Sequence, residues 1–281
     1  SKLLDQIAEQ NNFGIKTYSR LTGGDINDVF LLTSKEGEKS VVKLNDAQKY
    51  PGMFEAEKAG LEQLARPGVI DIPEVLGVGK IKDTAYLLLE YKASVPKAPD
   101  FSEKFGIQLA SLHKITSDEF GFPEDNYIGS LPQYNKSSKS AADFYISQRL
   151  EPQLKIAKYR GYSLQLSEDF FINISEIIPK EPPALIHGDL WNGNYLVNEK
   201  GMPCFIDPAT AYAPREMDLA MMKLFGGFEE EVFTTYQDQF PLAPSLEERV
   251  PLWQLYYLLV HLNLFGKGYL SSVSNIIKKY S

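Results

Sequence analysis

The feature of this sequence that most constrains its fold is a polar loop between two short apolar runs. Residues 184–197 read ALIHGDLWNGNYLV, and a third apolar run ends at Asp207. The turn residues at 198–201 predict a β-hairpin between the second and third runs. Such a hairpin would bring Asn194, which precedes its first strand, close to Asp207, which follows its second. The pattern therefore predicts a cluster of polar side chains at the ends of short strands.

The spacing of these polar residues is also informative. His187-x-Asp189, followed by Asn194 and the strand-terminal Asp207, resembles the catalytic loop and metal-binding Asp of protein kinases and aminoglycoside phosphotransferases. By this resemblance Asp189 is the general base that accepts a substrate hydroxyl proton, and His187 orients the loop. Asn194 and Asp207 supply the oxygen ligands that Mg²⁺ prefers. The alternative is that these residues only cap strand ends, because Asp, Asn and Gly are common in turns.

A second set of residues, elsewhere in the chain, bears on the same interpretation. The run VVKL places Lys43 within an apolar strand, an unusual position for a solvated charge. The helix expected at 53–65 carries Glu57, which fits the position of a partner for this lysine, with Glu55 as the alternative. A kinase-like fold needs such a pair, because the lysine binds the α- and β-phosphates of ATP. Glutamates are also common on helix surfaces, so the pair is a hypothesis.

Two more segments fit ATP binding by their position. Gly23 and Gly24 lie between two expected strands, upstream of Lys43, where the backbone could approach phosphates closely. A plain hairpin turn explains the two glycines equally well. An apolar run ends at Glu90, where the adenine-binding hinge of a kinase-like fold would lie. Backbone groups near Glu90 and Lys92 would then bind adenine, and the predicted cofactors are ATP and Mg²⁺.

The order of the expected elements divides the chain into two parts. Strands are expected at 15–21, 28–33, 40–44, 74–80 and 84–91, with helices at 1–12 and 53–65. Further helices are expected at 101–114, 141–159, 166–178, 216–224, 229–240 and 246–264. The predicted fold class is α+β, a protein-kinase-like two-lobed fold. Its N-terminal nucleotide-binding lobe, residues 1–91, has an antiparallel sheet plus helix, and its C-terminal catalytic lobe, residues 92–281, is mostly helical.

Composition narrows the range of partners. The 281 residues include 29 basic and 37 acidic residues, a formal net charge of −8, and no basic run stands out. A nucleic-acid or anionic-membrane partner is therefore disfavoured. The single cysteine, Cys204, cannot form an internal disulfide, and no apolar stretch is long enough to span a membrane. A cytoplasmic location is expected, and the sequence carries no signal for an oligomeric state.

Residues outside the generic pattern point to one family. Trp191 follows the Asp-Leu pair of the polar loop, and matching runs occur at 120–122, 126–129, 149–154, 206–209, 215–216, 218–221 and 224–228. These runs resemble the fructosamine kinase family. The resemblance implies ATP-dependent phosphorylation of a ketosamine, the adduct of a sugar and an amine, at its C3 hydroxyl. This phosphorylation makes the adduct labile and is associated with deglycation. Ribulosamine, erythrulosamine and fructosamine adducts all stay open as substrates, whether free or protein-bound.

The same resemblance assigns roles around the polar loop. Trp191, Tyr212, Arg215 and Glu216 are the candidate substrate contacts. Trp191 either stacks on the sugar or packs the loop. Asp218 is expected to accept backbone hydrogen bonds from the catalytic loop, which is a structural role near the site.

Two departures from the family pattern lie toward the presumed substrate side, at 209–215 and at Asp143. They bear on the identity of the substrate rather than on phosphoryl transfer. One alternative is therefore another kinase of the same fold, acting on an aminoglycoside, choline or a related amino alcohol. A second alternative is a non-catalytic nucleotide-binding protein. Such a chain usually lacks the base or a metal ligand, whereas all of these residues are present here.

Several large side chains on the expected helices are interpreted as core. His113 and His261 lie among leucines, and no metal-ligand spacing links them. Trp253, Tyr256 and Tyr257 recur at helical spacing. All five are therefore predicted to pack against neighbouring helices.

Overall fold

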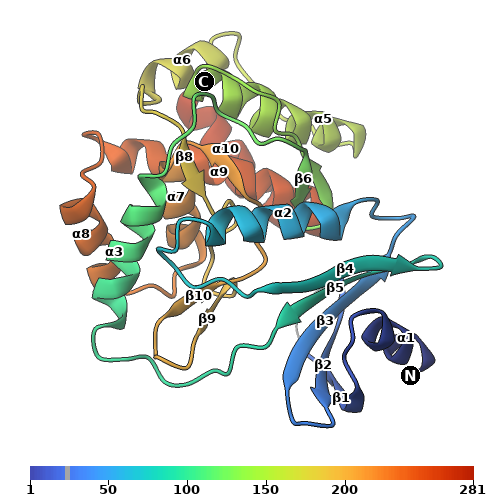
Figure 1. Ribbon diagram of the computed structural model, residues 1–281. Coiled ribbons are helices and arrows are strands. Elements are labelled where there is room, and N and C mark those ends of the chain that lie inside the picture. Colours follow the sequence, from blue (N-terminus) through green and yellow to red (C-terminus); the bar gives the residue numbers. More distant parts are fainter. Residues whose placement is uncertain (23–25) are drawn as a thin grey trace.

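The computed structural model describes residues 1–22 and 26–281, so the predicted phosphate contacts Gly23 and Gly24 lie outside the described residues. The N-terminal part is a five-stranded antiparallel sheet of order β1-β2-β3-β5-β4 with two helices (Figure 1). The strands are β1 (Ile15–Leu21), β2 (Asp28–Ser34), β3 (Lys39–Asp46), β4 (Val75–Ile81) and β5 (Thr84–Glu90). The helices are α1 (Lys2–Gln10) and α2 (Met53–Ala65).

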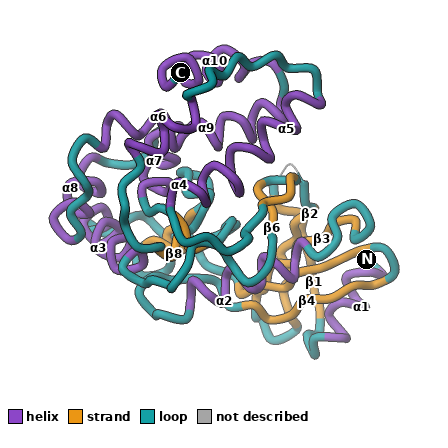
Figure 2. The backbone as a smooth tube through the Cα atoms, turned by 90° about the horizontal axis from the view of Figure 1, so that it is seen from above, coloured by secondary structure: helices purple, strands orange, loops and turns teal. Residues whose placement is uncertain are grey.

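The rest of the chain is mostly helical, and Figure 2 separates its helices from the strands of the N-terminal sheet. The helices are α3 (Phe101–His113), α4 (Ala141–Phe144), a π-helical segment (Tyr145–Leu150), α5 (Glu151–Tyr159), α6 (Phe170–Ile177), α7 (Glu216–Phe225), α8 (Glu230–Gln239), α9 (Leu246–Phe265), a 3₁₀ turn (Lys267–Tyr269) and α10 (Leu270–Tyr280). The short strands are β6 (Asn126–Ile128), β7 (Leu131–Gln133), β8 (Ala184–Ile186), β9 (Tyr195–Val197), β10 (Pro203–Phe205) and β11 (Ala211–Ala213).

The apolar side chains of strand β5 pack on both faces of the sheet. Successive side chains of a strand point to opposite faces. Tyr86 and Leu88 pack with α1, whereas Leu87 and Leu89 pack with α2 and the C-terminal part. Both faces of this strand are therefore covered, which explains why it is apolar throughout. Burying each large apolar side chain contributes roughly 1.5–3 kcal/mol.

The position of Lys43 follows from the same alternation. In β3, Val42 belongs to the cluster around α1. Lys43 is directly opposite Leu87 in the ladder, so its side chain points to the other face, toward α2. The sheet therefore directs one cation into the space between its own face and the C-terminal part.

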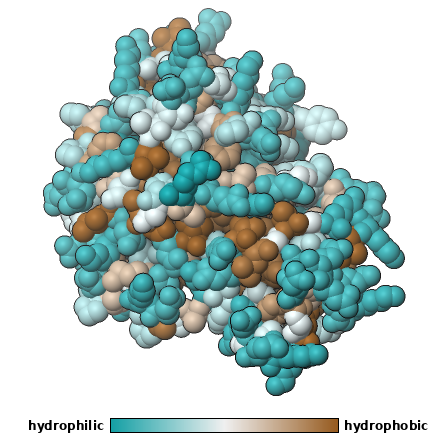
Figure 3. Space-filling model, viewed as in Figure 1, coloured by the Kyte–Doolittle hydropathy of each residue, from teal (hydrophilic) through white to brown (hydrophobic). Residues whose placement is uncertain are grey.

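Two short antiparallel ladders hold the polar loop. Strand β8 pairs with β11, with Ile186 opposite Ala211, and β9 pairs with β10, with Val197 opposite Pro203. The loop of residues 187–194 thus leaves one ladder and enters the other. On the face drawn in Figure 3, hydrophobic surface gathers in a band at the level of α2, between the sheet and the helical part.

The α+β fold class, the N-terminal antiparallel sheet and the predicted 195–206 hairpin are confirmed. Most predicted helices are present, but α6 begins at Phe170 rather than at 166. Gly161, with φ of +87°, follows the end of α5, and the chain between Gly161 and α6 is irregular. Helix α10 was missed: its apolar side chains pack against α9 and α6, which sequence alone does not place beside it.

Candidate active site

His187 begins the polar loop and fixes its shape. The side chain is fully buried, and its Nε2 donates to the carbonyl oxygen of Ile206 at 2.8 Å. Its Nδ1 accepts the backbone N–H of Asp189 at 3.1 Å. These two bonds require a neutral ring with the proton on Nε2. Burial also lowers the pKa of His187, so the residue orients the loop and carries no charge at neutral pH.

Asp218, in the first turn of α7, holds the same loop from the other side. Its two carboxylate oxygens accept the backbone N–H groups of His187 and Gly188, each at 2.9 Å. The side chain is fully buried. Burial alone would raise the pKa of Asp218, but the hydrogen bonds and charges of His113, with His187 and Gly188, outweigh burial and lower it. The structure thus contains the backbone contacts that the resemblance predicted for this residue.

Two residues that support the loop, His113 and Tyr257, were predicted from sequence only to pack against neighbouring helices. His113 on α3 contacts Asp218 through Nε2 at 2.9 Å and the hydroxyl of Tyr236 through Nδ1 at 2.8 Å. Tyr257 on α9 donates to the carbonyl oxygen of Gly188 at 2.9 Å. These partners come from segments 69 to 123 positions apart in the sequence, so no local pattern signals them.

Asp189 lies at the half-buried tip of the loop. The side-chain amide of Asn194 donates to the Asp189 carbonyl at 2.9 Å and to its carboxylate at 3.2 Å. Burial raises the pKa of the Asp189 carboxyl to about 7, and the nearby carboxylates of Asp207 and Asp218 add to the increase. A carboxylate whose pKa lies near neutrality is suited to accept a proton in catalysis.

Lys43 connects the two parts of the chain. Its Nζ forms an ion pair with Glu57 of α2 at 2.6 Å and a second ion pair with Asp207. Burial alone would lower the pKa of Lys43, but the carboxylates of Asp207 and Glu57 outweigh it and raise the pKa. The structure therefore brings together the sheet lysine, the helix glutamate and the strand-terminal aspartate. Glu55, the alternative partner, is exposed.

Asn194 and Asp207 lie at the base of the β9–β10 hairpin and are tied together, because Ile206 N–H donates to the Asn194 carbonyl at 3.1 Å. The Asn194 amide nitrogen is used by Asp189, and its Oδ1 receives no hydrogen bond within the described residues. An amide oxygen beside a carboxylate is a donor set that fits Mg²⁺. Residues 1–22 and 26–281 hold no cluster of three metal-ligating acids, histidines or cysteines. Two protein ligands suffice for Mg²⁺ in phosphoryl-transfer sites, where substrate phosphates and water complete its coordination.

Of the candidate substrate contacts, Trp191 and Tyr212 stay close to the loop and keep some exposure. Trp191 is 39% exposed, and its ring lies over Gly193, where an added Cβ would come within 2.2 Å of it. Tyr212 of β11 is half-buried and accepts a hydrogen bond from Gln63 of α2 at 2.9 Å.

Arg215 and Glu216, the other two candidate substrate contacts, are buried. Arg215 is 3% exposed, forms a bidentate pair with Glu181 at 2.7 and 2.9 Å, and lies over the ring of Phe240. Glu216 is 1% exposed and accepts two hydrogen bonds from Arg249, at 2.6 and 2.8 Å. Trp253, predicted only as core, also donates to Glu216 at 2.8 Å. Both residues anchor the start of α7.

The predicted hinge residues, Glu90 and Lys92, lie where β5 ends. Glu90 N–H donates to the Glu74 carbonyl at 2.9 Å, and the Lys92 side chain forms ion pairs with Asp71 and Glu90, each at 3.0 Å. The backbone N–H of Lys92 has no hydrogen-bond partner in the described part of the chain. That N–H is therefore available to a ligand.

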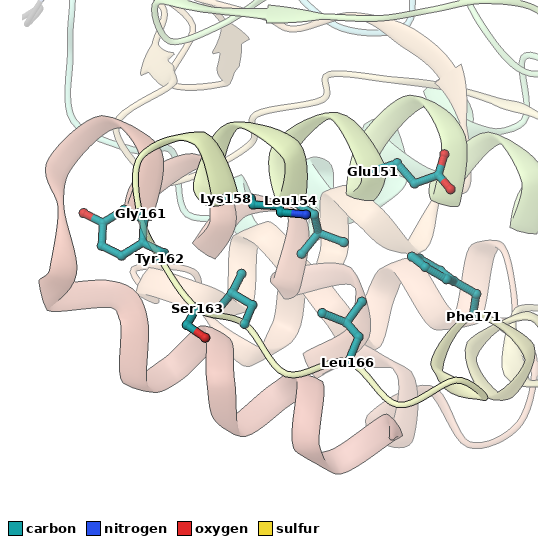
Figure 4. Close-up of a pocket in the computed structure, with 9 residues that line it drawn as sticks. Glu151, Leu154, Lys158, Gly161, Tyr162, Ser163, Leu166 and Phe171 are labelled. Atoms are coloured by element: carbon teal, nitrogen blue, oxygen red, sulfur yellow. The ribbon is translucent and has the colours of Figure 1, made fainter.

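An open groove of about 570 Å³ lies elsewhere, between α5 and the segment that follows it (Figure 4). Leu154, Leu166 and Phe171 line it together with Glu151 and Lys158. None of its lining residues belongs to the polar loop, the hinge or the lysine pair. The groove is therefore separate from the candidate active site.

Because Lys43 reaches Asp207 from the opposite part of the chain, the fold and the site define a phosphotransferase of the protein-kinase-like class. A family model described as fructosamine kinase matches residues 1–281. The chain belongs to this family of kinases.

Two curated relatives illustrate the similarity. A protein of Vibrio parahaemolyticus named "Probable ketoamine kinase" is 40% identical over 264 residues, which cover 92% of this chain and 91% of the relative. The ketosamine-3-kinase of Mus musculus is 30% identical over 274 residues, which cover 85% of this chain and 87% of the relative.

Solved structures agree on the fold. A crystal structure of a candidate fructosamine-3-kinase from Haemophilus somnus 129PT has a TM-score of 0.88 and 29% identity, covering 99% of this chain and 96% of that one. An amicoumacin kinase in complex with AMP-PNP and Ca²⁺ has a TM-score of 0.61 and 13% identity, covering 99% and 92%. The second likeness concerns the fold alone.

Gly188 provides a test of how tightly the loop is packed. Its φ is +87°, and an added Cβ would lie 1.9 Å from the Ala209 carbonyl oxygen. Gly188→Ala should lower the free energy of unfolding by roughly 3–5 kcal/mol in urea titrations, because strain and a backbone clash add. Gly161 has the same φ of +87° with nothing within 4 Å. Gly161→Ala should cost only about 1–2 kcal/mol, and equal losses in both variants would contradict the clash.

Asp218 predicts a pH dependence of stability. Its folded pKa is lowered, so its stabilising effect is present above the unfolded-state value of about 3.9 and is lost as pH falls through the lower folded value. Asp218→Asn should therefore destabilise the protein by roughly 2–4 kcal/mol at pH 7. The difference from the parent should shrink as the pH falls below about 4. Denaturant titrations at several pH values measure this, with Asp238→Asn on the exposed side of α8 as the control; a pH-independent difference would exclude the mechanism.

Proposed function

We propose that this protein is an ATP- and Mg²⁺-dependent kinase that phosphorylates a ketosamine at its C3 hydroxyl. The observation that carries the proposal is the contact of Lys43 with both Glu57 and Asp207. In a kinase-like fold this arrangement sets the lysine beside the phosphates and the aspartate beside the metal. Membership of the fructosamine kinase family supports the substrate class.

Asp189 is proposed as the general base. Its carboxylate is held by Asn194 and lies at the tip of a loop that His187 and Asp218 fix from both sides. A substrate hydroxyl placed beside it would give up its proton as the bond to phosphorus forms. The rigid loop keeps the base in one position, which is where most of the catalytic advantage of such a site arises.

Asn194 and Asp207 would hold Mg²⁺, which neutralises charge on the phosphate oxygens when it is bound. Lys43 would bind the phosphates, and Gly23 and Gly24 would approach them through their backbone. The backbone N–H of Lys92, which has no partner among the described residues, and the backbone at Glu90 would bind adenine. An amicoumacin kinase of the same fold was solved with AMP-PNP, which supports ATP as the cofactor.

The substrate would approach past Trp191, whose exposed ring lies at the surface of the polar loop. An aromatic ring offers an apolar surface to the CH groups of a sugar. Tyr212 lies opposite Leu185 of β8, the strand that leads into the loop, and is bonded to Gln63 of α2. Relatives named for ketoamines and ketosamines support an adduct of ribulose, erythrulose or fructose as the substrate. The protein would then act in deglycation in the cytoplasm. No helix in the described residues is long and apolar enough to cross a membrane.

Substrate class can be tested directly. The protein, ATP and Mg²⁺ should transfer phosphate to synthetic ribulosamine-, erythrulosamine- or fructosamine-lysine, read as an added phosphate by mass spectrometry. Kanamycin and choline, assayed in parallel, should be poor acceptors. Turnover of kanamycin or choline without turnover of any ketosamine would reject the proposed substrate and favour another kinase of the same fold.

The role of Asp189 has its own test. Asp189→Asn should lower kcat by roughly 10²–10⁴-fold, because the amide cannot accept the proton. ADP affinity, measured by calorimetry, should change by less than about threefold, since the substituted group does not contact the nucleotide in this proposal. Asp238→Asn serves as the matched control and should retain parent kcat. An Asp189→Asn enzyme with normal kcat would refute the assignment of the base.

A further inference from the structure

Asp71 joins three segments that are far apart in the chain. It precedes β4 in the N-terminal part, and its Oδ1 pairs with Lys92 of the hinge at 3.0 Å. Its Oδ2 accepts from the amide of Asn198, in the turn of the β9–β10 hairpin, at 2.9 Å. Its backbone carbonyl accepts the N–H of Phe205 in β10 at 3.0 Å. Both carboxylate oxygens and the backbone carbonyl of Asp71 therefore accept hydrogen bonds from the hinge or the hairpin.

The partners of Asp71 are themselves fixed. The Lys92 side chain is only 9% exposed and is also paired with Glu90 at 3.0 Å. Asn198 Oδ1 accepts the backbone N–H groups of Lys200 and Met202, at 3.0 and 3.1 Å, so the amide that reaches Asp71 is held by the hairpin turn. Both partners of Asp71 are thus held in place by further contacts.

The charges in this network favour its ionised form. Burial alone would raise the pKa of Asp71, but hydrogen bonds from Asn198 and Lys92 outweigh burial and lower it. Burial alone would lower the pKa of Lys92, but its bonds to Glu90 and Asp71 outweigh burial and raise it. The Lys92–Asp71 bond is charge-assisted, and its lysine is shielded from water. Such a bond is stronger than a fully exposed surface pair.

The two ends of the network carry different halves of the site. Lys92 has a backbone N–H without a partner in residues 1–22 and 26–281, and in the proposed function this group binds adenine. The hairpin has Asn194 before its first strand and Asp207 after its second. The connecting chain also runs along this hairpin, because Ala98 N–H donates to the Gly201 carbonyl at 3.1 Å. If the distance between hinge and hairpin is fixed, the distance between the proposed adenine site and the proposed phosphate site is fixed as well.

We propose that Asp71 is a positioning residue that locks the nucleotide-binding hinge at Lys92 against the β9–β10 hairpin, through its two carboxylate oxygens. The proposal rests on the proposed function, since it concerns the same nucleotide site. Without the lock the hinge must be ordered when the nucleotide binds, and that ordering lowers affinity.

The proposed role of Asp71 can be tested without turnover. The affinity for adenosine and for ADP is measured by calorimetry in the absence of metal. Asp71→Asn and Lys92→Met should each weaken both ligands about tenfold, the effect of one lost charge-assisted hydrogen bond. The double variant should be no weaker than either single variant, because both substitutions break one interaction. Lys92→Arg should restore affinity to within about threefold of the parent, since it keeps the ion pair.

Lys223→Met is the matched control, because Lys223 pairs with Glu247 at 2.7 Å at the surface, where the glutamate is 77% exposed. It should leave adenosine and ADP affinity unchanged. Thermal unfolding should show that every variant is folded at the assay temperature. A purely structural role for Asp71 would lower the melting temperature without changing the affinity of the folded protein, and this result would overturn the proposal.

Kinetics provide a second readout. With Asp71→Asn, KM for ATP should rise about tenfold while kcat at saturating ATP stays within about twofold. A loss of kcat with unchanged adenosine affinity would overturn the lock but leave the kinase assignment intact. Failure of the parent protein to bind ADP at all would instead refute the proposed function, and the lock with it.

Discussion

The contact of Lys43 with both Glu57 and Asp207 is the interaction on which the rest of the structure depends. It joins the sheet and α2 to the end of the β9–β10 hairpin, and so adds an ionic link between two parts of the chain that also share a hydrophobic cluster. A buried ammonium without partners would cost several kcal/mol. Both carboxylates must therefore be in place for the cation to stay there, and any arrangement of the two parts that separates them is disfavoured. A triphosphate with its metal would offer this lysine an alternative set of negative charges.

Much of the fold and site could be predicted from the sequence because the signals are local. The apolar runs of β3 and β5, the helical spacing of α2 and the turn between β9 and β10 can each be recognised in a short stretch of sequence. The spacing of Asp189, Asn194 and Asp207 is also a local signal, because one loop and one adjoining hairpin carry all three residues. Family resemblance added the backbone contacts of Asp218, which spacing alone does not specify.

What could not be predicted depends on partners that are distant in sequence. His113 and Tyr257 resemble ordinary helix-packing residues until α3 and α9 are placed beside the polar loop. Arg215 and Glu216 lie next to functional residues in the sequence, yet their side chains turn inward to Glu181 and Arg249. Position along the chain predicts where the candidate site lies, but the direction of each side chain is set by the surrounding helices.

The alternation of β3 has a consequence for the accuracy of folding. Val42 and Lys43 are neighbours that serve opposite faces of the sheet, one against α1 and one toward the site. If β3 paired one residue out of step with β2 and β5, the valine would face the carboxylates and the ammonium would be driven into the apolar layer beneath α1. This single shift in pairing would remove Lys43 from the site and would also disrupt the hydrophobic layer beneath α1. Correct pairing of β3 therefore sets both the apolar layer beneath α1 and the position of Lys43, which in the proposed function is needed to bind a nucleotide.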